Sequence, residues 1–422
     1  MNTKPYFDAC VQSISQIVRI DSSQAPALPH MPFGKGAADS LKYFLDLAAS
    51  FGFETHNYDN YVGDVIFGDG EEFAILAHLD VVPAGNGWTK DPFGGEIADG
   101  KLYGRGTMDD KGPAVICLYG LKALKDSGFK PSKKIKLIVG CNEENGWECM
   151  AHYKKVAHMP DYGFTPDADF PAIYAEKGIL HFEMQFPVKN APFTALYGGK
   201  GVNMVCDEAF AQCDETEGAE RYSLRVEDGL LVSRGVSAHG STPEKGKNAL
   251  EPLFAYFART NEDMRRAHEI LFEDIFGLKN FADETGRLTM SPDVANYGDG
   301  ILSVCVDIRY PATLPLQAVL DVLNKTGVRY EEIHHQSALF NPKDSFLIQT
   351  LQRVYNEATG ERAEPIAIGG GTYARALECG AGFGPQLCGE PVTIHQKDEY
   401  ISIPHVKFLL NLYRRAVEEL TK

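Results

Sequence analysis

The sequence lacks the features that mark membrane-spanning proteins and disulfide-bonded secreted proteins. No window approaches the roughly 20 consecutive apolar residues that a bilayer span needs, and residues 1–6 lack the apolar core of a signal peptide. The nine cysteines are odd in number and include no CxxC pair, so they predict neither a disulfide framework nor a cysteine zinc site. We therefore expect a cytoplasmic protein.

Positive charge is also scarce. The 41 basic and 58 acidic side chains give a formal net charge of −17 at pH 7. This excess repels a phosphate backbone and an anionic bilayer, so we expect neither a nucleic acid nor a membrane as a partner. Most of the carboxylates are expected to form an ordinary solvated surface, and only a handful need belong to a functional site.

Several well-known catalytic motifs are missing, whereas three metal-ligand segments are present. The chain has no Walker A lysine loop, no HExxH, no GxSxG elbow and no GxGxxG fingerprint. It does have, in order, AHLDVVP at residues 77–83, GRGTMDDKG at residues 104–112 and NEENG at residues 142–146. Each segment places imidazole or carboxylate groups at a predicted strand end or in a glycine-rich turn, as a two-metal hydrolase requires.

Length and hydrophobic periodicity predict an α/β protein of two domains. A chain of 422 residues exceeds the size at which one hydrophobic core stops growing. Continuous apolar runs predict buried strands at residues 73–77 and 134–140, and apolar positions at helical spacing predict helices at residues 7–20, 37–51 and 113–125. This alternation favours a mainly parallel twisted sheet flanked by helices. Residues 161–171, rich in Asp, Pro and aromatics, are predicted to form a loop.

The pattern changes at about residue 181, where alternating strands predict a second domain. Strands are predicted at residues 181–186 and 301–310 and a helix at about residues 248–260. Long helical patterns return at residues 346–359 and 406–419. We therefore predict a discontinuous catalytic metal-binding domain, residues 1–184 and 338–422, with an inserted α+β lid domain at residues 185–337.

Each ligand segment has an ordinary structural explanation when it is taken alone. His78 and Asp80 project from one face of a strand, where the carboxylate can fix the tautomer of a metal-bound imidazole, yet such a triplet is more often structural. The glycines around Asp109 suit a ligand shell or a tight surface turn. Glu143 and Glu144 can provide a general base and a ligand, or can be a solvated acidic pair. Together with Asp167 and His395, these residues suit two divalent cations bridged by a carboxylate.

Further segments carry a resemblance that extends over nearly the whole chain. They are TPDADFP at residues 165–171, NMV at 203–205, AHG at 238–240, GGGT at 369–372 and HQ at 395–396. With the three ligand segments, they resemble the di-zinc exopeptidase and amidohydrolase family of aminoacylase, glutamate carboxypeptidase and carnosinase. The closer similarity is to its bacterial PepV-like, Xaa-His type dipeptidases. Cys206 departs from that pattern, in which proline is expected, and this departure bears on the backbone near Asn203.

The resemblance implies a metal site shared by five side chains. His78, Asp109 and Asp167 would hold one cation, and Asp109, Glu144 and His395 would hold the other, with Asp109 as the bridge. It implies two divalent ions per chain, Zn²⁺ first, with Mn²⁺ or Co²⁺ as alternatives.

The resemblance also assigns catalytic roles next to the metals. Asp80 would orient His78, and Glu143 would act as general acid/base toward a bridging water and the leaving amine. Asp169 remains the rival of Asp167 as a ligand, although the position after the proline favours Asp167.

In the lid, His239 would stabilise the developing oxyanion, and Asn203 and Arg309 would bind substrate. Arg309 could instead simply pair with Asp307 on its strand. Gly371 and Thr372 could bind the substrate's terminal carboxylate or merely form a tight turn.

These expectations define a metal-dependent dipeptidase that acts as a monomer on small dipeptides. The alternatives are an N-acyl-amino-acid deacylase or related amidohydrolase, with the same metal centre, and a non-catalytic peptide- or metal-binding homologue. The preferred dipeptide, the physiological metal and the resting state of the lid stay open at this level.

Overall fold

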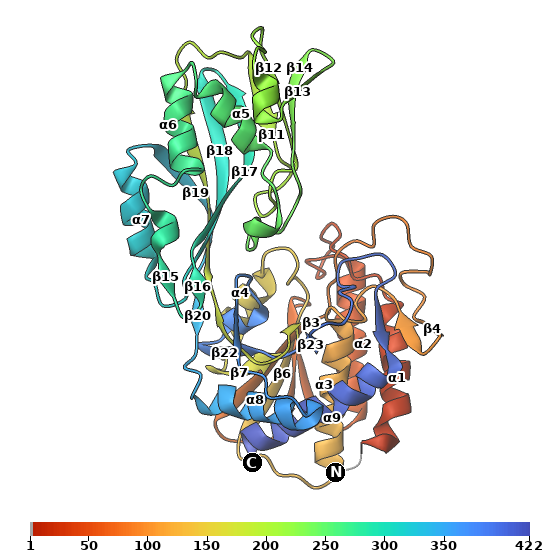
Figure 1. Ribbon diagram of the computed structural model, residues 1–422. Helices are drawn as coiled ribbons and strands as arrows, with labels where there is room; N and C mark the ends of the chain where they lie inside the picture. Colours follow the sequence, from red (N-terminus) through yellow and green to blue (C-terminus); the bar gives the residue numbers. More distant parts are fainter. Residues whose placement is uncertain (1–2) are drawn as a thin grey trace. The chain divides into compact units, whose positions relative to one another are not determined.

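The chain divides into two units in the computed structural model, which describes residues 3–422 (Figure 1). The first unit contains the described residues up to Tyr174, together with Asn341–Ile366 and Thr372–Lys422. The second contains Ala175–Phe340 and Ala367–Gly371. The glycine-rich residues 369–371, which we expected in the catalytic domain, therefore pack with the second unit. A backbone hydrogen bond joins this segment to the second unit, because the Lys177 N–H donates to the Ile368 carbonyl at 3.0 Å.

The first unit is built on a sheet whose central strands are parallel. The strand order is β1-β2-β6-β3-β7-β22-β9-β20, with β21 beside β9. The ladders β6–β3, β3–β7 and β7–β22 are parallel, and the flanking ladders are antiparallel. The strands are β1 (Glu54–Tyr58), β2 (Val62–Phe67), β3 (Glu72–His78), β6 (Lys134–Gly140), β7 (Tyr162–Thr165), β9 (Ile173–Glu176), β20 (Leu339–Phe340), β21 (Ile366–Ile368) and β22 (Cys379–Gly382).

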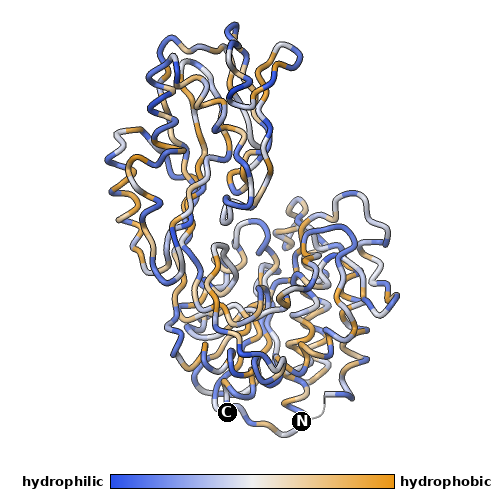
Figure 2. Tube along the Cα trace, viewed as in Figure 1, coloured by the Kyte–Doolittle hydropathy of each residue, from blue (hydrophilic) through white to orange (hydrophobic). Residues whose placement is uncertain are grey.

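Helices cover this sheet, and apolar burial explains why. Residues 73–77 of β3 are fully buried, as expected for a strand covered on both faces. Helix α3 packs against β3 and β6 and lies beside α1 and α9, and α2 and α4 pack against β2. The helices are α1 (Lys4–Val18), α2 (Lys35–Ser50), α3 (Lys111–Asp126), α4 (Glu148–Val156), α8 (Phe346–Thr359) and α9 (Ile403–Thr421). The hydrophobic colour in Figure 2 follows the central strands and alternates with hydrophilic colour along the helices.

The second unit is an antiparallel sheet with helices packed on it. Its order is β13-β14-β12-β11-β17-β18-β10-β19. The strands are β10 (Gly178–Pro187), β11 (Ala195–Gly198), β12 (Glu208–Gln212), β13 (Arg225–Glu227), β14 (Leu230–Arg234), β17 (Thr289–Gly298), β18 (Ile301–Tyr310) and β19 (Arg329–Gln336). Along β10 every second residue from Leu180 to Phe186 is buried, and this face joins a core with α5 (Leu250–Phe257) and α6 (Glu262–Leu271). Helix α7 (Leu316–Lys325) contributes Val319 and Leu323 to the same core.

Short elements complete both units. They are β4 (Glu96–Ala98) and β5 (Lys101–Tyr103) with β24 (Tyr400–Ser402), β8 (Ala168–Asp169) with β23 (Pro385–Gln386), β15 (Ala282–Asp283) with β16 (Gly286–Arg287), and the 3₁₀ helices η1 (Ala219–Tyr222), η2 (Pro243–Lys245), η3 (Leu278–Asn280) and η4 (Tyr373–Ala376). Among residues 3–422, no helix combines the length and apolar character that a membrane crossing needs.

The predicted fold class is confirmed, with two refinements. The strands expected at residues 134–140 and 301–310 and the helix at 346–359 have the predicted bounds. The predicted loop at residues 161–171 is wrong, because it contains β7, a strand too short to show a period between Pro160 and Pro166. Within the first sheet, the parallel ladders lie in the middle, and the short ladder of β8 and β23 is also parallel.

Candidate metal centre

Three adjacent parallel strands deliver metal-ligand side chains to one edge of the first sheet. Strands β6, β3 and β7 are neighbours, with His78 paired to Gly140. His78 ends β3, Glu144 follows β6 by four residues, and Asp167 follows β7 by two. Because the carboxyl ends of parallel strands meet at the same edge, residues distant in sequence come together there.

Asp109 reaches the same place from the glycine-rich turn that precedes α3. This turn is held by Glu399, whose Oε1 accepts the N–H groups of Gly106 at 3.1 Å and Met108 at 2.9 Å. Its Oε2 lies 2.7 Å from Nη1 of the buried Arg105. Gly106 has φ +93°, a conformation that side-chain-bearing residues rarely adopt. Glu399 thus fixes the backbone that presents Asp109.

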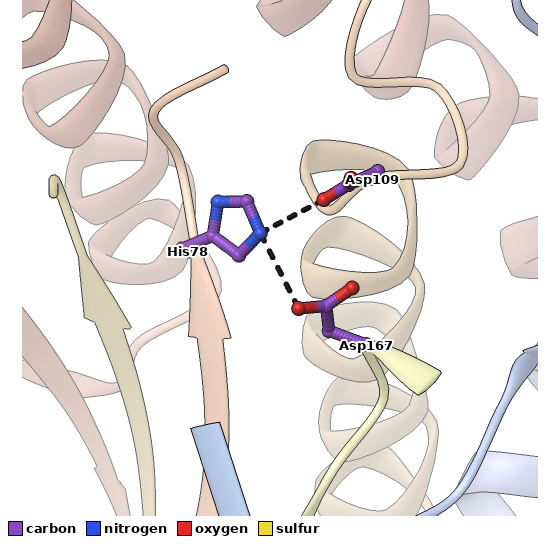
Figure 3. A group of neighbouring side chains, drawn as sticks. All are labelled: His78, Asp109 and Asp167. Atoms are coloured by element: carbon purple, nitrogen blue, oxygen red, sulfur yellow. Dashed lines mark ion pairs between the residues drawn. The ribbon is translucent and has the colours of Figure 1, made fainter. Parts of the chain in front are cut away.

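The five predicted metal ligands converge in the first unit, and Figure 3 shows three of them, His78, Asp109 and Asp167. Asp109 Oδ1 lies 2.9 Å from His78 Nε2, and Asp109 Oδ2 lies 2.8 Å from His395 Nε2. His78 Nε2 is also 3.5 Å from Asp167 Oδ2, and His395 Nε2 is 3.2 Å from Glu144 Oε1. The ligand atoms of His78, Asp109 and Asp167 lie within 4.8 Å of one another, and so do those of Asp109, Glu144 and His395. The two groups share Asp109, one oxygen facing each histidine.

This donor set fits divalent cations. His78 Nδ1 donates a hydrogen bond to the backbone oxygen of Asp80 at 3.0 Å, which leaves Nε2 as the atom that can bind a cation. Nε2 is buried and has no hydrogen-bond partner. Imidazole and carboxylate donors with no thiolate suit Zn²⁺, Mn²⁺ or Co²⁺.

The pKa shifts of the centre arise from burial and from the close approach of its carboxylates and histidines. Burial and the charge of Asp109 raise the pKa of Glu144 and of Asp167, and hydrogen bonds to Asp109 and Glu144 raise the pKa of His395 to about 10. The pKa of Asp109 is held below its usual range because His395 and His78 outweigh the effect of burial. An added positive charge between these groups is therefore favourable.

Asp80 and Glu143 sit beside the ligands, and the carboxylate of Asp80 acts mainly on Glu143 and Glu144. Asp80 Oδ1 accepts the Glu143 N–H at 3.0 Å and Oδ2 accepts the Glu144 N–H at 3.1 Å. Its Oδ1 is 3.5 Å from His78 Nδ1, farther than the backbone oxygen that orients the ring. Burial raises the pKa of Glu143, and the charges of Asp167 and Glu144 raise it further against the opposing effect of His78.

The structure separates the two candidate ligands that follow β7. Asp167 belongs to the group around His78, and its side chain is 18% exposed. Asp169 pairs with Gln386 in the short ladder of β8 and β23, is exposed and belongs to neither group of ligand atoms. This geometry favours Asp167.

The second unit gathers most of the predicted substrate-contacting residues. Asn203 and His239 are exposed neighbours, since the Gly240 N–H donates to the Asn203 carbonyl at 2.8 Å. His239 Nδ1 accepts the Ser241 N–H at 3.2 Å, which fixes the tautomer with hydrogen on Nε2. Partial burial and the charge of Arg309 lower the pKa of His239, which favours the neutral form of the ring.

Arg309 forms the pair with Asp307 that we considered as its alternative role. Its Nε and Nη2 donate to Asp307 at 2.7 and 2.8 Å, its Nη1 donates to the Gly369 carbonyl at 3.2 Å, and the residue is 3% exposed. Gly371 follows in the same segment of the second unit. Thr372 begins the first unit, where its Oγ1 accepts the Ala374 N–H at 3.2 Å, as expected for a turn. Substrate binding by these residues stays a prediction.

Several residues of the centre were missed by the sequence analysis. Glu399 gave no signal, because a lone glutamate near His395 is unremarkable until the fold brings it to the Asp109 turn. Asp110 is fully buried and accepts the His78 N–H at 3.1 Å. The Trp147 indole N–H donates to Glu143 Oε1 at 3.2 Å. Only Asp110 had a sequence signal, as the second acid of the segment 104–112.

Comparison with known proteins gives a consistent result over almost the full chain. Residues 74–419 match the peptidase family M20/M25/M40. The chain is 36% identical to the putative dipeptidase YtjP of Bacillus subtilis, covering 98% of this chain and 97% of that protein. It is 35% identical to the Beta-Ala-Xaa dipeptidase of Lactobacillus delbrueckii subsp. lactis, covering 98% and 96% respectively.

Solved structures share the fold at low sequence identity. The aminoacylhistidine dipeptidase of Vibrio alginolyticus is 14% identical with a TM-score of 0.63, covering 100% of this chain and 98% of that one. Human carnosine dipeptidase 1 is 17% identical with a TM-score of 0.59, covering 99% and 98%.

Proposed function

The chain belongs to peptidase family M20/M25/M40, and from this premise we propose that it is a metal-dependent dipeptidase whose catalytic centre is the cluster around Asp109. One observation carries the proposal: the two oxygens of Asp109 face two histidines at 2.9 and 2.8 Å, with a further carboxylate beside each histidine. The relatives above, named as dipeptidases, match over nearly their whole length, which supports the same substrate class.

We propose that two divalent cations bind, one to His78, Asp109 and Asp167, the other to Asp109, Glu144 and His395. Zn²⁺ is the first candidate, and Mn²⁺ and Co²⁺ suit the same donors. When bound, such a pair supplies Lewis acidity toward the scissile carbonyl and lowers the pKa of a water molecule.

Glu143 is proposed as general acid/base. Its carboxylate accepts a proton from the attacking water and returns it to the nitrogen of the leaving amine. Its raised pKa suits this task, since a carboxyl group that holds a proton more firmly than usual is a better base and still a competent acid. Asp80 fixes the backbone of Glu143 and Glu144 because its carboxylate accepts their backbone N–H groups.

The second unit is proposed to act as the lid that binds the substrate. The Nε2–H of His239 is free of the contacts made by Nδ1 and suits donation to the developing oxyanion. Asn203, Arg309, Gly371 and Thr372 are proposed to contact the dipeptide, with Arg309 and the glycine-rich segment near its terminal carboxylate.

The proposal also covers location and assembly. Each of the nine cysteines lies within the described residues and is a free thiol, which supports a reducing, cytoplasmic compartment. We propose that the enzyme is a monomer, and light scattering of the purified chain tests this.

A panel assay tests the function. After the protein is stripped of metal, each divalent ion is added back in turn and hydrolysis is measured on α-dipeptides, β-alanyl dipeptides and N-acetyl amino acids. We expect metal-dependent cleavage of dipeptides that is lost in Glu143→Gln. Cleavage of N-acetyl amino acids alone would establish a deacylase instead, and full turnover by Glu143→Gln would refute the catalytic assignment.

A further inference from the structure

Trp147 contacts the carboxylate of Glu143 directly. Its indole Nε1–H donates to Glu143 Oε1 at 3.2 Å, and the structure gives this carboxylate no other side-chain donor within residues 3–422. The Glu143 backbone N–H is already held by Asp80, so the indole is what orients the end of the side chain.

The backbone of Trp147 has an unusual conformation. Trp147 has φ 65° and ψ 24°, the left-handed region that is unfavourable for a bulky residue and that tends to occur at functional sites. The backbone N–H of Trp147 donates to the Asn142 carbonyl at 2.9 Å. The Asn142 side chain accepts the backbone N–H of Glu148 at 2.9 Å. Asn142 is buried, so its two hydrogen bonds fix the turn that carries the indole.

The ring of Trp147 is also fixed by packing. It meets the buried Tyr373 edge-on, with ring centroids 5.1 Å apart and planes at 82°. The Tyr373 hydroxyl lies 2.8 Å from Cys149 Sγ in the first turn of α4. The donor therefore has little freedom to leave Glu143.

We propose that Trp147 is a positioning residue for Glu143. By holding Oε1, the indole turns Oε2 toward the reacting groups, so that the same oxygen accepts the proton of the attacking water and delivers it to the leaving amine. A side chain that transfers a proton twice in one cycle gains from being held in one rotamer. This inference rests on the proposed dipeptidase function.

Trp147→Phe is the first test, because it removes the donor and keeps a ring to pack on Tyr373. Trp88→Phe is the matched control, since the chain has two tryptophans and the Trp88 indole donates to the Ala84 carbonyl instead. We expect kcat for dipeptide hydrolysis to fall about 10- to 100-fold in Trp147→Phe, with KM within about twofold and the bound metal unchanged. Trp88→Phe should keep wild-type kcat. Wild-type kcat in Trp147→Phe, or an equal loss in both variants, would overturn the proposal.

A fluorescence measurement tests the contact without activity and without altering Trp147. In a Trp88→Phe background, Trp147 is the sole tryptophan, and at a pH where Glu143 is ionised, Glu143→Gln removes the charge beside the indole nitrogen. Because excitation moves electron density away from that nitrogen, the loss of the carboxylate charge should shift the emission maximum to shorter wavelength. An unchanged emission spectrum contradicts the contact. If wild type cleaves no dipeptide in the panel, the proposed function fails, whereas an active wild type with unchanged Trp147→Phe kinetics refutes this inference alone.

Discussion

Replacing Arg309 with methionine would leave a buried carboxylate without its charged partner. Asp307 is fully buried and receives two N–H groups from Arg309 at 2.7 and 2.8 Å. After the substitution, the remaining polar side chain beside Asp307 is that of His181, whose Nε2 lies 3.4 Å from Asp307 Oδ1. Burial raises the pKa of Asp307, but His181 and Arg309 outweigh it and hold the pKa below its usual range. The native pair therefore keeps Asp307 ionised.

The burial of this pair sets the expected loss in the free energy of unfolding. Breaking one partner of a buried ion pair costs about 3–5 kcal/mol of folding stability, whereas replacing both partners by apolar residues of similar size is often close to neutral. Asp307→Leu with Arg309→Met should thus be more stable than Arg309→Met alone. A residual loss of about 1 kcal/mol is expected, because the Gly369 carbonyl loses the donor at 3.2 Å.

Denaturant unfolding followed by circular dichroism measures these differences, with the transition of the second unit compared between variants. Arg234→Met is the control, since Arg234 lies in the same sheet but its side chain is 52% exposed, and its pair with Glu227 is expected to contribute less than about 1 kcal/mol. A loss below about 1 kcal/mol in Arg309→Met, or additive losses in the double variant, would show that the pair does not stabilise the unit as the geometry implies.

Three further predictions address pH, ligand choice and support of the centre. Burial raises the pKa of Asp293 to about 8, against about 3.9 in the unfolded chain, so the stability it contributes is full below pH 4 and is lost as pH rises toward 8. Asp293→Asn should gain stability relative to wild type from pH 5 to pH 9 by about 4 kcal/mol in denaturant unfolding, and a difference that does not change with pH would contradict this. Asp167→Asn should lose one cation per chain by elemental analysis, whereas Asp169→Asn should keep both; the reverse result would make Asp169 the ligand. Glu399→Gln should weaken metal affinity about 10- to 100-fold, and the exposed Glu390→Gln should not, so equal affinities would refute the role of Glu399.

The sequence predicted well wherever local pattern and tertiary position agree. The apolar run of β3 and the parallel pairing of β6, β3 and β7 follow from burial on both faces, and the pairing alone brings His78, Glu144 and Asp167 to one edge. Asp109 and His395 could be proposed because their segments resemble a known family. Their convergence within 4.8 Å needed the fold.

What sequence could not reveal depends on long-range contacts with no local pattern. Glu399 supports Gly106 across 293 positions, and Asp80 turned out to hold backbone N–H groups more closely than the imidazole of His78. The placement of Gly369 in the second unit is of the same kind, because the segment is held there by the Lys177 N–H on the Ile368 carbonyl and by Arg309 on the Gly369 carbonyl.

The central claim is that Asp109 holds two cations at once. Elemental analysis of metal-loaded protein after removal of excess ion, with dipeptide hydrolysis measured on the same samples, tests it most directly. We predict two divalent ions per chain and activity in wild type, and loss of both ions and of activity in Asp109→Ala. Two ions retained by Asp109→Ala, or an active wild type that holds none, would contradict the account.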